Sequence, residues 1–186
     1  MSATGSAGSH SLLTATRYSS GRWDVVIDRP AADVWQAFAD PDEAQRETMQ
    51  RLTTFHQSIW DETSEDLGDV VLLTRKLKDG APRTAFFESL EGALYVRIIK
   101  EIPPRQRVYR LDAVDEKFAG FIDYTLIDLP DGQTKLVYSA FVEIRRVTPD
   151  QAEAYSFEEE TVYWGRYTDE NLGAIKVAAE QGRAAT

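Results

Sequence analysis

The feature that most constrains the fold is a long succession of strand-like segments, from about residue 55 to residue 145, followed by one long helical segment. Stretches of alternating apolar and polar residues are separated there by turn signals such as Asp131-Gly132, where glycine reaches the positive φ of a tight hairpin turn. Consecutive strands joined by short turns predict an antiparallel sheet. The predicted strands cover residues 55–62, 69–77, 83–90, 93–102, 107–113, 121–129 and 134–146.

One strand and two short helices are predicted ahead of this region. In the segment RWDVVIDRP (22–30), Trp23, Val25 and Ile27 alternate with charged residues, which indicates a half-buried strand. Pro30 suits the first position of a short helix, and Asp40-Pro41 ends that helix. A second short helix is predicted over residues 42–52.

The last element is predicted to be a long helix that ends near Gln181-Gly182. Thr148 is a suitable N-cap, Pro149 suits the first turn, and Gln151 completes a capping box. The sequence also allows a break in this helix near Ser156. A strongly curved antiparallel sheet can wrap one long helix and leave a cavity between the two.

Composition limits the classes of protein that this chain can represent. The 186 residues suit one domain, and no apolar run approaches the roughly 20 residues of a membrane-spanning helix. A net charge of -10 disfavours binding to nucleic acid or to anionic membranes. The absence of cysteine excludes disulfides and thiolate chemistry and fits a cytoplasmic location. Residues 1–20, which begin with small and polar residues, are predicted to form a flexible tail ahead of a single domain over residues 21–182.

Two segments resemble a known superfamily. WDVVIDRPAADVWQAFADPD is similar to the opening of the START/Bet v 1-like (SRPBCC) superfamily, and LIDLPDGQTKLVYSAF resembles its last hairpin. The resemblance extends over roughly residues 20–182 and implies an α+β helix-grip fold, with about seven antiparallel strands around a long C-terminal helix. It also implies a cavity for a hydrophobic ligand, in the manner of polyketide cyclases and dehydratases that need no cofactor. The superfamily has no universal catalytic residues to transfer.

The final helix carries the candidate catalytic residues. At 100° per residue, Trp164 and Thr168 fall on its buried stripe, and Glu160, Tyr167 and Asn171 line up along the border of that stripe. A carboxylate at a cavity rim can act as a base, a phenol can donate a hydrogen bond to a developing oxyanion, and an amide can orient a substrate oxygen. The alternative remains open that this border is an exposed flank, with Glu160 in water or paired with an arginine.

The predicted strands supply candidate groups for binding a substrate. Tyr124 and Tyr138 fall on the face that we expect to meet the helix, and Tyr109 is a further pocket candidate. His56 lies in a predicted strand, where a structural hydrogen bond is the simpler interpretation and a part in the substrate site is the alternative. Tyr95 and Arg97 share one face of their predicted strand, and the sequence does not decide whether that face is inward. The full set predicted to bind substrate is His56, Tyr95, Arg97, Tyr109, Tyr124, Tyr138, Trp164 and Thr168.

These features favour a cofactor-independent cyclase, dehydratase or lyase that acts on a small hydrophobic, aromatic molecule. Two alternatives remain: a carrier of hydrophobic ligands with the same fold, and a partner-binding module whose interior is filled by side chains. Two histidines, no cysteine and no calcium-loop spacing predict that no metal takes part. A homodimer is possible, and we expect neither nucleic acid nor membranes as partners.

Overall fold

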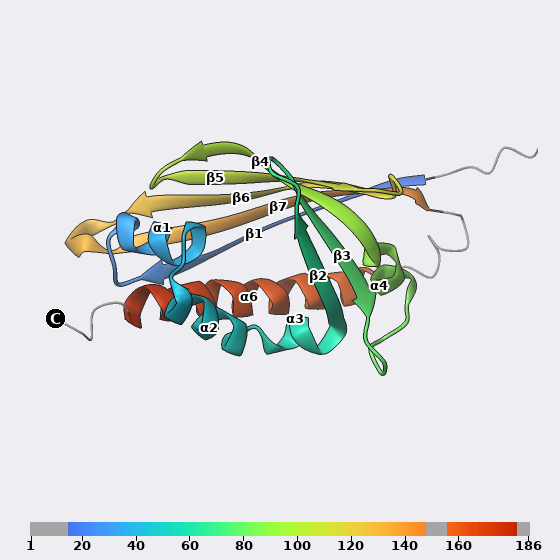
Figure 1. Ribbon diagram of the computed structural model, residues 1–186, viewed down its shortest axis with the longest axis horizontal. Coiled ribbons are helices and arrows are strands. Elements are labelled where there is room, and N and C mark those ends of the chain that lie inside the picture. Colours follow the sequence, from blue (N-terminus) through green and yellow to red (C-terminus); the bar gives the residue numbers. More distant parts are fainter. Residues whose placement is uncertain (1–14, 148–155, 182–186) are drawn as a thin grey trace, which may run out of the picture.

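A computed structural model describes residues 15–147 and 156–181 of the chain. A seven-stranded antiparallel sheet of order β1-β7-β6-β5-β4-β3-β2 curves over the long helix α6, so the predicted helix-grip architecture is confirmed (Figure 1). The strands are β1 (Ala15–Ile27), β2 (Trp60–Asp66), β3 (Val71–Leu77), β4 (Gly92–Ile102), β5 (Gln106–Ala113), β6 (Phe118–Asp128) and β7 (Thr134–Val147). The helices are α1 (Ala31–Ala39), α2 (Glu43–Leu52), α3 (Thr54–Ile59), α4 (Ala85–Leu90) and α6 (Phe157–Gln181), with a 3-10 turn at Pro130–Gly132.

The first strand confirms the predicted alternation but begins earlier than predicted. Ile27 is buried and Trp23 and Val25 are half-buried, whereas Asp24 between them is exposed. Since β1 starts at Ala15 and pairs along its length with β7, the assignment of residues 15–20 to a flexible tail was wrong. The strand alternation was readable only from residue 22 onward, because the serines and Gly21 before it give no apolar signal.

The helices after β1 follow local capping rules. The carboxylate of Asp42 accepts a hydrogen bond from the backbone N–H of Gln45, whose side chain accepts one from the N–H of Asp42, which closes a capping box at the start of α2. A third helix, α3, follows directly. The predicted strand over residues 55–62 is therefore wrong in its first half, and strand geometry begins only at Trp60.

The predicted strand over residues 83–90 is also wrong, because most of it forms the short helix α4. Its apolar residues Phe86, Phe87 and Leu90 are spaced to fall on one helical face, and all three are buried in one cluster. The chain then turns at Gly92, whose φ of +130 places the start of β4 directly after the helix.

The hairpin between β6 and β7 turns where the sequence predicted. Asp131 and Gly132 have φ values of 66 and 77, so both occupy the left-handed region. Pro103 and Pro104 likewise form the turn between β4 and β5. At the other end of β7, the predicted capping residues Thr148, Pro149 and Gln151 lie outside the described residues, whereas α6 ends at Gln181 as predicted.

The concave face of the sheet packs on α6. Leu126, Leu136 and Tyr138 of the last hairpin form one buried cluster with Leu172 and Ile175, which confirms the predicted inward face. A second cluster gathers α3, α4 and the sheet around the buried ring of Tyr163. Among the helices in the described part of the chain, none is long and apolar enough to cross a membrane.

Candidate ligand pocket

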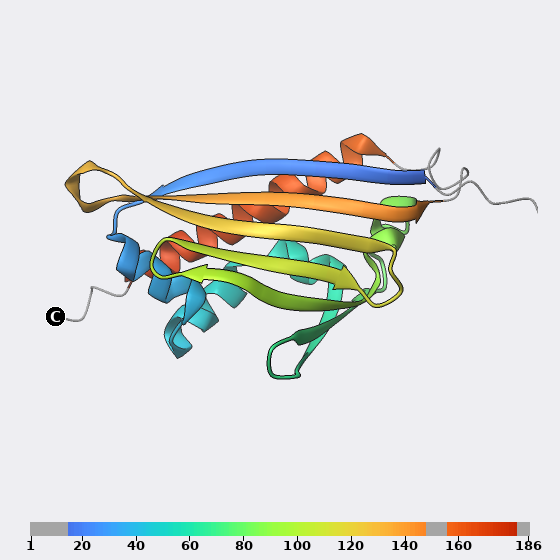
Figure 2. The same cartoon turned by 90° about the horizontal axis from the view of Figure 1, so that it is seen from above.

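A pocket of about 340 Å³ lies between the sheet and the first half of α6. β1 passes over this part of α6, with β7 beside it (Figure 2). The volume of the pocket falls within the range of sites for small organic ligands. The lining residues are Tyr18, Ser19, Ser20, Gly21, Trp23, Ala140, Val142, Glu160, Thr161 and Trp164.

The ring of Trp23 is held against its own strand. Gly21 and Trp23 share the inward face of β1, and a Cβ atom at Gly21 would lie 1.9 Å from the Trp23 ring. Glycine is therefore required for the ring to fold back over the strand. On its other side the ring contacts Tyr138 of β7, with 5.8 Å between ring centroids. Trp23 thus forms a fixed aromatic wall of the pocket.

The helix contributes Glu160, Thr161 and Trp164 to the same pocket. Glu160 is only 3% exposed, and its side chain lines the pocket. By the same helical periodicity Thr161 would lie on the buried stripe, but it is exposed at the pocket rim. The ring of Trp164 is half-buried and lines the pocket instead of filling the space between sheet and helix.

The other two residues of the predicted catalytic set have different neighbours. Tyr167 packs its ring against Trp164 and His56, at centroid distances of 5.8 and 5.1 Å. Asn171 donates a hydrogen bond to the hydroxyl of Tyr124 on β6, over 3.0 Å. Glu160 lines the pocket under β1, so the three residues follow one edge of the helix without sharing a set of contacts.

Tyrosines of the sheet form a row across its concave face. The ring of Tyr109 meets that of Tyr124 at 6.2 Å, and Tyr124 meets Tyr138 at 5.1 Å, both edge to face. Burial raises the pKa of Tyr124 and of Tyr138 well above the ordinary value, and it also raises the pKa of Tyr167. These phenols therefore stay protonated near neutral pH and remain hydrogen-bond donors.

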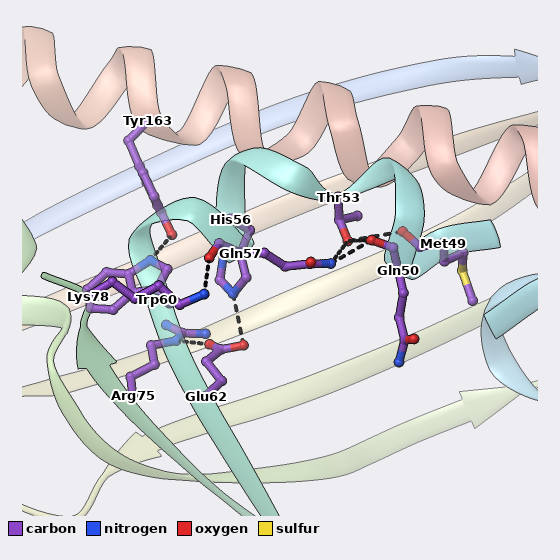
Figure 3. A network of polar contacts seen from close by, with 10 residues as sticks. All are labelled: Met49, Gln50, Thr53, His56, Gln57, Trp60, Glu62, Arg75, Lys78 and Tyr163. Atoms are coloured by element: carbon purple, nitrogen blue, oxygen red, sulfur yellow. Dashed lines mark hydrogen bonds and ion pairs between the residues drawn. The ribbon is translucent and has the colours of Figure 1, made fainter. Parts of the chain in front are cut away.

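A charged cluster lies at the far end of this face, beneath α3 (Figure 3). Nε2 of His56 is 2.9 Å from one carboxylate oxygen of Glu62, and Nε of Arg75 bonds the other. Nearby, the indole N–H of Trp60 donates to the hydroxyl of Tyr163 over 2.9 Å. The side chains of His56, Glu62 and Arg75 are 14%, 25% and 16% exposed.

The charges within this cluster stabilise one another. Burial alone would raise the pKa of Glu62, but the hydrogen bond from His56 and the charge of Arg75 outweigh it and lower that pKa to about 2. Burial alone would lower the pKa of Arg75, and the carboxylate of Glu62 raises it above the ordinary value. Glu62 is therefore a permanent anion at neutral pH and a poor base.

Glu62 and Arg75 were not predicted as site residues. Residues 61–66 belong to β2, and Glu62 stands directly across from Arg75 of β3. Only the strand register brings the two charges together. No sequence signal singles out Glu62, because no apolar residue follows Trp60 along β2 and Asp61, Glu65 and Asp66 are also acidic.

Two predicted binding residues lie away from the concave face. Tyr95 is 41% exposed and Arg97 is also exposed, while their neighbours Leu94 and Val96 turn inward. Thr168 is fully buried on α6, as predicted. Among the described residues, no three histidine, aspartate or glutamate side chains are grouped closely enough to hold a metal ion.

Comparison with solved structures identifies proteins that share this fold. Norcoclaurine synthase from Thalictrum flavum superposes with a TM-score of 0.59 at 10% identity, covering 89% of this chain and 88% of that one. The Zhui aromatase/cyclase from Streptomyces sp. R1128 gives a TM-score of 0.57 at 15% identity, covering 91% and 98%. A conserved protein from Geobacillus kaustophilus gives 0.59 at 12% identity, covering 88% and 96%.

Sequence comparison gives no match to any protein-family model and none to a curated protein. The similarity therefore lies in the fold. The chain has the helix-grip fold, which it shares with norcoclaurine synthase and with the aromatase/cyclase.

Proposed function

We propose that the pocket under β1 binds a small aromatic molecule and catalyses a proton-transfer reaction of the cyclase, dehydratase or lyase type, without metal or organic cofactor. The observation that carries this proposal is a buried carboxylate, Glu160, in a pocket walled by the rings of Trp23 and Trp164. Aromatic walls suit a flat ligand, and a desolvated carboxylate is suited to act as a base. An aromatase/cyclase and norcoclaurine synthase share the fold, which is consistent with this class of chemistry.

In the proposed reaction, Glu160 removes a proton from the ligand, and nearby hydroxyl groups stabilise the charge that develops on a ligand oxygen. Ser19 lies on the inward face of β1 and lines the same pocket, so it is the suitable donor there. Tyr167 acts indirectly, because its ring packs against the pocket-facing ring of Trp164. Asn171 fixes the hydroxyl of Tyr124 and so orders the aromatic wall behind Trp23.

Binding is tested first, with variants that fill the pocket or leave it open. Ala140 lines the pocket, and its neighbour Ser139 points to the opposite face of β7, so Ala140→Leu and Ser139→Leu form a matched pair. Dopamine, hydroxybenzaldehyde and phenol serve as probes; the first two are held by a norcoclaurine synthase of the same fold. Binding is read from tryptophan fluorescence, since two of the four tryptophans line the pocket.

We expect a probe to quench wild-type fluorescence and raise the melting temperature, because a ligand selective for the folded state stabilises it. Ala140→Leu should weaken binding at least ~10-fold, since the added atoms occupy ligand volume at a cost of more than ~1.4 kcal/mol. Ser139→Leu and Trp35→Phe should keep the response. If none of the three probes binds the wild type, or if Ala140→Leu binds as well as the wild type, the pocket is not the ligand site.

Catalysis is tested on Glu160. Glu160→Gln keeps the shape of the side chain and removes the base, so turnover should fall by ~10²-fold or more while the probe still binds. The matched control is Glu158→Gln, because Glu158 is exposed on the same turn. Glu159 is less suitable, since its carboxylate accepts a hydrogen bond from Thr84 over 2.6 Å.

Conversion is measured by mass spectrometry after incubation with dopamine and hydroxybenzaldehyde, and then with aromatic polyketides. Equal turnover by Glu160→Gln and the wild type on any converted compound would show that Glu160 is not the base. A wild-type protein that binds a probe and converts none of these compounds would instead be a carrier of aromatic ligands.

A further inference from the structure

The convex face of the sheet, which is turned away from α6, carries a band of exposed aromatic side chains. Figure 2 views this face, with α6 behind the strands. Phe121, Tyr95, Phe141 and Tyr18 are 37%, 41%, 42% and 61% exposed. The strand register places them in two neighbouring rows that cross the sheet from β1 to β4. Single exposed apolar side chains are common, but a group of them marks a surface that another molecule covers.

The first row of this band holds the positive charges. Each of its residues stands directly opposite the next on the neighbouring strand, in the order Ser20, Phe141, Phe121, Arg110 and Arg97. The guanidinium of Arg110 lies over the ring of Phe121, 4.5 Å from its centroid, and bonds Asp112 over 2.6 Å. Arg97 is exposed and has no acidic partner among the described residues, although it stands opposite a second arginine, which repels it.

The second row holds the negative charges. Its residues, again directly opposite one another, are Tyr18, Glu143, Ala119, Asp112 and Tyr95. The ring of Tyr18 stacks on Phe141 of the first row, with 5.9 Å between centroids. Two arginines and two acidic residues leave the band without net charge, whereas the whole chain carries -10. Two copies of this acidic chain can therefore approach each other at this band with little local repulsion.

The two rows are complementary to each other, which points to a second copy of the chain as the partner. A two-fold axis that crosses the strands between the rows places the arginine row of each copy over the carboxylate row of the other. Two sheets packed face to face keep their strands within about 30° of each other, so the rows remain opposed near the axis. Phe121, on the central strand of the band, lies beside this axis.

We propose that the protein forms a two-fold symmetric dimer through the convex face of its sheet, with Phe121 at the centre of the interface. The band has two rows of five residues, against roughly 20–30 residues a side in a stable interface, so the dimer is weak and depends on protein concentration. β1 contributes residues both to this band and to the pocket of Glu160, but the dimer does not rest on the reaction proposed there.

Sedimentation equilibrium of the full-length protein tests the association directly. The average mass should rise from that of one chain towards twice that value as the concentration increases from micromolar to millimolar. Phe121→Glu should abolish this rise, because it brings two carboxylates together at the axis. Ile127→Glu is the matched control and should associate like the wild type. Ile127 lies on the same strand and face and is 42% exposed, but it is about 20 Å from Phe121.

A mixture of two variants distinguishes a lost interface from a damaged fold. Phe121→Glu and Phe121→Lys should each remain monomeric alone, whereas their equimolar mixture should associate, because opposite charges then meet across the axis. Arg97→Glu should also weaken the dimer, and it decides if a Phe121 variant does not fold. A wild type that stays monomeric at millimolar concentration would overturn the proposal. So would equal weakening by Phe121→Glu and Ile127→Glu, or a folded mixture that does not associate.

Discussion

At the scale of single residues, Glu62 makes a prediction about stability and pH. Its pKa falls from an ordinary 4.5 to about 2 on folding, so it adds stability in full above pH 4.5 and loses it as the pH drops towards 2. A shift of this size corresponds to at most about 3 kcal/mol. Urea unfolding between pH 7 and pH 2 should therefore show a smaller loss of unfolding free energy in Glu62→Gln than in the wild type. Glu65→Gln, an exposed change on the same strand, should behave like the wild type, and an equal loss in Glu62→Gln would contradict the assigned pairing.

The positions of residues were predictable where they depended on one element alone. Helical periodicity alone placed Trp164 and Thr168 on the inward stripe of α6 and Glu160 at its border. In the structure Thr168 is fully buried, and Glu160 and Trp164 line the pocket. It could not place Glu62 opposite Arg75, because that contact depends on the register between two strands. For the same reason, the sequence did not decide which face of the sheet Tyr95 lies on. Its position on the convex face follows only from the pairing of β4 with β3 and β5.

At the scale of elements, strands and turns were predicted better than short helices. α3 and α4 have six residues each, so neither spans two full turns, and a strand alternation over His56, Ser58 and Trp60 fits the sequence equally well. What favours helix over residues 54–59 is tertiary: Glu170 on α6 accepts a hydrogen bond from the N–H of Phe55 over 2.8 Å and so binds the start of α3. A contact between residues this far apart in the chain cannot be predicted from the local sequence.

The same element gives His56 its place. In the predicted strand, His56 would have pointed along the sheet face with Ser58 and Trp60. In the helix it turns away from Ser58 and reaches across to Glu62, while Trp60 starts the strand that carries Glu62. The error in secondary structure therefore concealed the charged cluster, although each of its residues was visible in the sequence.

At the scale of the whole molecule, two neighbouring regions with different chemistry lie along α6. Under β1 lies the pocket with Glu160, and towards α3 lie the tyrosine row and the His56 cluster. Trp164 belongs to the first region and touches Tyr167 of the second. The order of the strands produces this division. β1 lies at one edge of the sheet, paired with β7, and β2 forms the opposite edge.

Shortening the chain tests the contribution of β1 to the pocket of Glu160. The part of β1 before Gly21 supplies Tyr18, Ser19 and Ser20 to this pocket, whereas Trp23, further along the strand, contacts Tyr138 of the tyrosine row. A chain that starts at residue 15 keeps the whole of β1, whereas one that starts at residue 21 lacks the part that pairs with Phe141 through Val147 of β7. Removing it uncovers Val142 and Ile144 at the new sheet edge, so we expect the melting temperature to fall, as measured by circular dichroism.

Ligand binding should follow the same pattern. The chain from residue 15 should match the full-length protein in melting temperature and in quenching by the phenolic probes. The chain from residue 21 should lose the quenching, because one wall of its pocket is gone. Quenching retained by the shorter chain would place the aromatic probes elsewhere in the molecule.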